Sequence, residues 1–223
     1  MTFRGVLFDW RGTLAVSPTY ETWAADALRR LGRPPGGDEV AALGQRLAGV
    51  AGPLDAPGTD TDADLHRRTY VRVLRGLGLD EELVAALYAA ECDPACNPFA
   101  EDAAETLAGL RNAGLRIGVI SDIHVDLRPA FAAAGVPADV FTLSFEQGVQ
   151  KPDPTMFTRT LAALELGPGQ ALMVGDRSRP DGAAVELGIA TLLLPPLVHP
   201  SERRLHLVSA LCGSEPGSIS HAR

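Results

Sequence analysis

Short apolar runs that alternate with helix-like segments limit the fold of this chain more than any other feature. From about residue 101 onward each apolar run is separated from the next by a segment with helical spacing. The predicted strands are 115–120, 140–144, 171–174 and 189–194, preceded by a first strand at 3–8. The predicted helices are 102–112, 127–134, 154–166, 182–187 and one after 201. This alternation predicts an α/β fold, a doubly wound parallel Rossmann-like sheet covered on both faces.

A second, helical unit is predicted between the first strand and the alternating region. Residues 17–96 contain no convincing strand, and their apolar residues are spaced as in helices. The expected domains are therefore an α/β core of 1–16 and 97–212, an all-helical cap of 17–96 and a flexible tail of 213–223. Because the helical segment follows the first strand directly, it can close over a site at the edge of the sheet.

Polar residues stand where the predicted strands end. Asp9 follows the first strand, Ser121 and Asp122 the second, and Asp176 the strand at 171–174, with Asp181 five residues later. In an open parallel sheet, ligands bind outside the carboxyl ends of the strands, where the strand order reverses. These side chains are therefore expected to converge on one cleft.

Three further residues join this expected cleft. Gly12 and Thr13 complete a D-x-x-G-T turn, and Lys151 opens the sequence KPDP ahead of a helix. Of the 20 basic residues, Lys151 is the only lysine and the others are arginine. A lysine kept at this one position suggests a place where a compact ammonium, rather than a planar fork, meets both a phosphate and an aspartate. Carboxylates from different strands beside a lysine and a hydroxyl predict a site for a divalent cation and a phosphoryl group.

In these motifs and their order the sequence resembles the haloacid dehalogenase superfamily, most of whose members are phosphatases and phosphotransferases. The resemblance covers residues 3–16 and 97–195, and the helical segment is similar to the family's cap. It implies that Asp9 is a nucleophile that forms an aspartyl-phosphate and that Mg²⁺ is the cofactor. It further implies the remaining roles: catalysis by Ser121 and Lys151; phosphate binding by Gly12, Thr13, Ser121, Asp122 and Lys151; and metal binding by Asp9, the Arg11 main-chain carbonyl, Asp176 and Asp181.

Arg11 departs from the family pattern. The resembling phosphatases carry a second aspartate there, which protonates the leaving group and then activates water. Arginine stays protonated and cannot do this work. Losing such a group costs roughly 10²- to 10⁴-fold in rate, so slow hydrolysis of the intermediate is expected. His124 and Asp122 are the nearest candidates to replace the acid, although His124 is more typical of an exposed helix start and Asp122 of a helix cap.

Two related chemistries also lack the second aspartate. The resembling dehalogenases use no metal and lack the acid found here at Asp176, so the acidic sequence GDRSRPD speaks against them. The resembling phosphonate enzymes need a lysine in the cap, and residues 17–98 contain none. Two functions remain open: a Mg²⁺-dependent hydrolase of a small phosphorylated metabolite, and a non-catalytic phosphate-binding or regulatory protein on the same fold.

Composition limits the partners. A net charge of −8 argues against nucleic acid, which clustered cations bind. No signal-peptide core or membrane span is apparent, so a cytoplasmic protein is expected, as a monomer or homodimer acting on a small molecule. Cys92, Cys96 and Cys212 are odd in number, and the C-x3-C pair has no second ligand pair or nearby histidines to complete a zinc site, so buried or idle thiols are expected.

Overall fold

The computed structural model describes residues 3–213, so the tail predicted as flexible lies, apart from Gly213, outside the described residues. A five-stranded sheet in the order β3-β2-β1-β4-β5 forms the centre of the protein, and all of its pairings are parallel. The strands are β1 (Gly5–Phe8), β2 (Arg116–Ser121), β3 (Val140–Leu143), β4 (Ala171–Gly175) and β5 (Ala190–Leu193). The predicted doubly wound α/β fold is confirmed.

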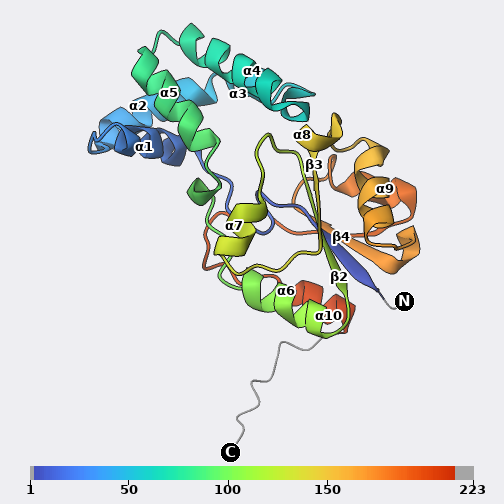
Figure 1. The fold of residues 1–223 in the computed structure, drawn as a ribbon. Helices are drawn as coiled ribbons and strands as arrows, with labels where there is room; N and C mark the ends of the chain where they lie inside the picture. Colours follow the sequence, from blue (N-terminus) through green and yellow to red (C-terminus); the bar gives the residue numbers. More distant parts are fainter. Residues whose placement is uncertain (1–2, 214–223) are drawn as a thin grey trace, which may run out of the picture.

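Helices cover both faces of this sheet (Figure 1). One face packs against α6 (Ala103–Asn112), α7 (Arg128–Ala133) and α10 (His206–Cys212). The other packs against α9 (Pro154–Ala163) and the 3-10 helix η4 (Gly182–Leu187). In β1, Val6 and Phe8 enter the first apolar cluster and Leu7 enters the second, all fully buried. This burial on both faces explains why the strands are continuous apolar runs.

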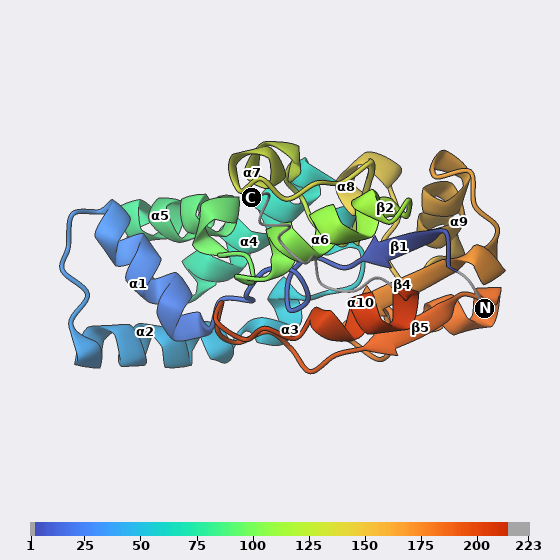
Figure 2. The same cartoon turned by 90° about the horizontal axis from the view of Figure 1, so that it is seen from below.

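Five helices form a separate group, called here the helical unit: α1 (Tyr20–Arg30), α2 (Gly37–Ala48), α3 (Ala51–Leu54), α4 (Ala63–Gly76) and α5 (Glu81–Glu91). Figures 1 and 2 show them gathered at one end of the molecule, beyond the sheet. They share an apolar cluster of their own, which includes Leu28, Leu47, Leu74 and Leu87. The spacing of the apolar residues along the chain thus produces a second core.

The short connections of the helical unit also contact the sheet domain. The 3-10 helix η1 (Thr59–Thr61) packs against α8 (Ser144–Gln147). The Ser144 hydroxyl donates to the Asp60 carbonyl at 2.7 Å, and the Gly58 amide donates to Gln150 Oε1 at 2.9 Å. The helical unit therefore rests on the α/β core at a second place besides its chain connections. Among the described residues, no helix has the length and apolarity needed to cross a membrane.

Candidate active site

The centre of the candidate site is a buried group of two carboxylates and one ammonium. Lys151 Nζ donates to Asp9 Oδ1 and to Asp181 Oδ1, each at 2.6 Å. All three residues are at most 2% exposed. Burial opposes the charge on Lys151, but Asp9, Asp122 and Asp181 outweigh that effect and raise its pKa. The only lysine of the chain is therefore held charged between two acids.

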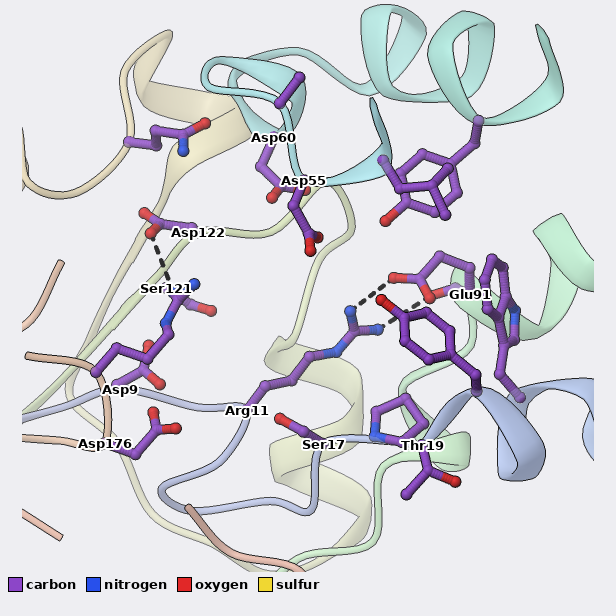
Figure 3. Close-up of a pocket in the computed structure, with 18 of the residues that line it drawn as sticks. Asp9, Arg11, Ser17, Thr19, Asp55, Asp60, Glu91, Ser121, Asp122 and Asp176 are labelled. Carbon is purple, nitrogen blue, oxygen red and sulfur yellow. Dashed lines mark hydrogen bonds and ion pairs between the residues drawn. The ribbon is translucent and has the colours of Figure 1, made fainter. Parts of the chain in front are cut away.

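The order of the strands explains this convergence. β1 lies at the centre of the sheet between β2 and β4, so the residues that follow these strands are neighbours. The Asp9 amide continues the ladder by donating to the Val174 carbonyl at 2.9 Å. Ser121, at the end of β2, and Asp176, directly after β4, line the same cavity as Asp9. Figure 3 shows Asp9 and Asp176 on one side of that cavity.

Asp181 supports the loop that carries Asp176. Its Oδ2 accepts the backbone amides of Asp176 at 3.2 Å and Arg177 at 3.0 Å, while its Oδ1 accepts Lys151. Both of its oxygens are therefore used in fixing other groups. Gly12 completes the packing: its φ is +81°, and a Cβ there would lie 2.4 Å from Asp176 Oδ2. Only glycine lets this turn approach the carboxylate so closely.

Two carboxylate oxygens at the centre of the site have no hydrogen-bond partner in the described part of the chain. Asp9 Oδ2 and Asp176 Oδ1 are buried and make no hydrogen bond to any described residue. Burial is the main cause that raises the pKa of each residue to about 6; Lys151 opposes the shift at Asp9, and the charge of Asp9 adds to it at Asp176. One oxygen from each of Asp9, Asp176 and Asp181 lies within 4.8 Å of the others. Such unpaired, buried anionic oxygens suit a hard cation.

The predicted phosphate-binding residues lie around this centre. Ser121 is buried at the cavity wall, and Thr13 is fully buried with no hydrogen bond to its Oγ1 among the described residues. Asp122 Oδ1 accepts the Lys151 amide at 2.7 Å, and Asp122 Oδ2 lies 3.3 Å from Arg177. Asp122 therefore braces the Lys151 loop, and burial raises its pKa. Sequence reasoning missed Arg204, which donates to the carbonyls of Gly12 and Thr13.

Arg11 points away from the nucleophile. Figure 3 shows its side chain extending from the β1 loop toward Glu91 at the end of α5. Arg11 Nη1 donates to Glu91 Oε1 at 2.6 Å, and Nη2 lies 3.3 Å from both the Glu91 carbonyl and Asn97 Oδ1. The side chain of Glu91 is 7% exposed and that of Arg11 is 26% exposed. The residue that replaces the expected acid thus binds the helical unit to the core.

The cavity itself has a volume of about 640 Å³ and lies between the strand ends and the helical unit. From the helical side it is lined by aromatic rings and by Asp55 and Asp60, which project into it (Figure 3). Burial and the charge of Asp60 raise the pKa of Asp55. No sequence motif identified these two acids, because they lie in an irregular connection far from the strand ends.

The expectation that His124 is an exposed helix start is wrong. It is 3% exposed and packs with His66 from α4, the two rings being stacked with centroids 3.3 Å apart. The helical unit covers His124, an effect that local sequence cannot reveal. His124 therefore packs against the helical unit, whereas Asp122 lines the cavity with Asp9 and braces the Lys151 loop. Cys92, Cys96 and Cys212 are partly buried and form no disulfide among the described residues.

Comparison with known proteins identifies the family of this fold. The haloacid dehalogenase-like hydrolase family matches residues 3–186. Similar solved structures include a HAD phosphatase from Thermococcus onnurineus, with a TM-score of 0.63 and 22% identity over 96% of this chain and 100% of that one. An L-2-haloacid dehalogenase from Xanthobacter autotrophicus has a TM-score of 0.64 and 23% identity, over 99% of this chain and 85% of that one. A defluorinating L-2-haloacid dehalogenase has a TM-score of 0.64 and 28% identity over 97% and 89%.

Among curated proteins, none matches the chain. The family match extends over most of the sequence and includes every strand of the sheet except the edge strand β5. The chain therefore belongs to the haloacid dehalogenase-like hydrolases, as the resemblance in its motifs predicted. Structures of both phosphatases and dehalogenases are similar to it, so the family alone does not give the reaction.

Proposed function

We propose that the protein is a Mg²⁺-dependent phosphohydrolase that transfers a phosphoryl group from a small phosphate ester to Asp9. One observation carries this proposal: Asp176 places an unpaired, buried carboxylate oxygen beside the unpaired oxygen of Asp9. A metal-free dehalogenation, in which Asp9 displaces a halide from an uncharged carbon, would gain nothing from the second carboxylate at Asp176. A divalent cation bound by Asp9 and Asp176 would account for both unpaired oxygens.

The donor set fits Mg²⁺. Asp9, Asp176 and the main-chain carbonyl of Arg11 would hold it, and this carbonyl accepts no hydrogen bond among the described residues. All of these donors are oxygens, which Mg²⁺ prefers. Asp181 would support the cation site without binding the ion directly, because its oxygens already accept hydrogen bonds from Lys151 and from the Asp176 loop. When bound, the cation would neutralise charge on the transferring phosphoryl group.

The residues of the chain divide the remaining work. Lys151 orients the Asp9 carboxylate by donating to its Oδ1, so that this carboxylate can attack phosphorus as the bond to the leaving oxygen breaks. Ser121 lies at the cavity wall, where its hydroxyl can donate to a phosphoryl oxygen. The Lys151 ammonium offsets the negative charge that gathers on the phosphoryl group. Water then cleaves the acyl phosphate and releases inorganic phosphate.

The second step is the slow one in this proposal. Arg11 is engaged with Glu91, Asp122 accepts the Lys151 amide and His124 stacks on His66, so in this proposal none of these described residues takes the place of the missing acid. Without a base the attacking water is not activated, at a cost of roughly 10²- to 10⁴-fold. We infer that the helical unit acts as a cap over this chemistry, closed in part by the Arg11–Glu91 ion pair.

Dehalogenation is the second candidate, favoured by the similar dehalogenase structures. The test compares two products from one preparation: phosphate from an aryl phosphate, with and without Mg²⁺, and halide from 2-chloropropionate. The proposal expects the wild type to release phosphate but no halide, and to do so only when Mg²⁺ is present. It expects Asp176→Asn to release neither product. Halide release without metal would overturn it. If neither product forms while phosphate still binds, the non-catalytic function replaces it.

A further inference from the structure

A second group of metal-ligating side chains lies where the helical unit meets the α/β core. Asp60 comes from η1, His66 from α4, and His124 from the loop after β2. Their ligand atoms lie within 4.8 Å of one another. Neither the phosphohydrolase proposal nor the family motifs use this group.

The inner nitrogens of the two histidines face the same carboxylate oxygen. His66 Nε2 lies 3.8 Å and His124 Nδ1 lies 3.4 Å from Asp60 Oδ1. Both histidine side chains are 1% exposed. The buried Nδ1 of His124 nevertheless makes no hydrogen bond to any described residue. An unsatisfied nitrogen of this kind costs free energy unless something binds it.

The outer nitrogens each have a different polar neighbour. His66 Nδ1 lies 3.4 Å from the Tyr88 hydroxyl, and His124 Nε2 lies 3.5 Å from Cys92 Sγ. In metal-bound histidines the second ring N–H typically makes a hydrogen bond, which fixes the tautomer and the ring orientation. Tyr88 and Cys92 would therefore direct the two inner nitrogens toward Asp60.

We propose that Asp60, His66 and His124 bind a borderline divalent cation of the Zn²⁺ type, which links the helical unit to the core. Two imidazoles and one carboxylate are a ligand set that Zn²⁺ accepts, leaving a fourth position for water. The two rings are stacked almost in parallel, so their outer edges must open for the inner nitrogens to converge on one ion.

This site has a route to solvent. Asp60 is 31% exposed and lines the same 640 Å³ cavity as Asp9, so an ion can enter through the cavity. Because Asp60 and His66 belong to the helical unit and His124 to the core, a bound ion would hold the helical unit against the core. Since Asp60 belongs to the cavity wall, occupancy also fixes the shape of the wall opposite the nucleophile.

The test uses Co²⁺ as the probe, with the full chain freed of any histidine tag and with excess Mg²⁺ to occupy the all-oxygen site. Tetrahedral Co²⁺ with imidazole ligands absorbs visible light far more strongly than octahedral Co²⁺ with oxygen ligands. The proposal expects one strongly absorbing Co²⁺ per chain, displaced by one equivalent of Zn²⁺. It also expects a rise in Tm on adding Zn²⁺, because a ligand of the folded state stabilises it.

Variants identify the ligands. Removing even an outer partner of a metal ligand costs roughly 10- to 100-fold in affinity, so His66→Asn and His124→Asn should each weaken Co²⁺ binding by about 100-fold or more. His199→Asn is the matched control, because His199 is exposed and remote from this group in the sequence. Unchanged binding by folded His66→Asn and His124→Asn, or only weak octahedral absorption in the wild type, overturns the proposal. The wild-type spectrum decides the matter even if a variant fails to fold.

Discussion

Replacing Arg11 by aspartate tests the structural reason for slow hydrolysis. The change supplies the acid that the site lacks, but it also leaves Glu91 without its partner. Glu91 is 7% exposed, and its Oε1 lies 2.6 Å from Arg11 Nη1. The new aspartate would place a second negative charge near a carboxylate that has lost its cation. Activity and stability should therefore move in opposite directions.

The magnitude follows from burial. Breaking a fully buried ion pair by removing one partner costs about 3–5 kcal/mol. Because the Arg11 side chain is 26% exposed, water offsets part of this loss, and Arg11→Asp should lower the free energy of unfolding by about 2–3 kcal/mol. Arg11→Asp combined with Glu91→Gln should recover most of that loss, since glutamine carries no charge to leave unpaired.

Urea unfolding and phosphate release measure the two effects. Arg75→Asp is the control for stability, because its pair with Glu81 is solvent-exposed and its loss should not be resolved in the same titration. The double variant should hydrolyse an alkyl phosphate at least about tenfold faster than the wild type, within the 10²- to 10⁴-fold that an acid/base group can supply. A single variant as stable as the wild type would refute the structural role of the pair. A stable double variant with no gain in rate would refute the chemical argument.

Three further variants test the centre of the site. Lys151→Met should lower the free energy of unfolding by about 3 kcal/mol in urea at pH 7, because two buried carboxylates lose their cation; no loss would contradict the buried ion group. Asp176→Asn should stabilise the metal-free protein by about 1 kcal/mol at pH 7.5, after allowing for partial exposure, since its carboxylate, with a pKa of about 6, is ionised there at a cost. That gain should shrink as the pH falls from 6 toward 4, where the folded protein takes up the proton, and an undiminished gain at pH 4 would contradict it. Gly12→Ala should weaken the Mg²⁺-induced rise in Tm because its Cβ meets Asp176, whereas Gly58→Ala, with φ of +87° and no atom within 4 Å, should not.

The residues after the strands were predictable because a local pattern fixes them. An apolar run that ends in Asp9 or Ser121 identifies both the strand and the polar group at its carboxyl end. Because parallel strands end at the same edge of the sheet, these groups come together there whatever the conformation of the connecting loops. Lys151 was identified by its isolation in an arginine-rich chain, and it lies between Asp9 and Asp181.

What lay beyond prediction depends on contacts between distant segments. Arg11 and Glu91 are 80 residues apart, so no local pattern shows that the arginine turns away from the nucleophile. His124 was expected at the surface because its neighbours are those of a helix start, and His66 from the helical unit buries it. The cysteines alone gave no reason to expect a zinc site. The proposed ligands Asp60, His66 and His124 come from both the helical unit and the core, so they form no short sequence motif that could be recognised.

The most direct test of the central claim is a rapid-mixing time course of an aryl phosphate with Mg²⁺, comparing the wild type with Asp9→Asn. An aryl leaving group needs little proton donation, so the first step should be fast even with Arg11 in place. The account predicts a burst of about one product per site, absent in Asp9→Asn and followed by slow release, because Asp9 is phosphorylated and water is poorly activated. Rapid linear turnover from the first turnover onward, or a burst that survives in Asp9→Asn, would contradict it.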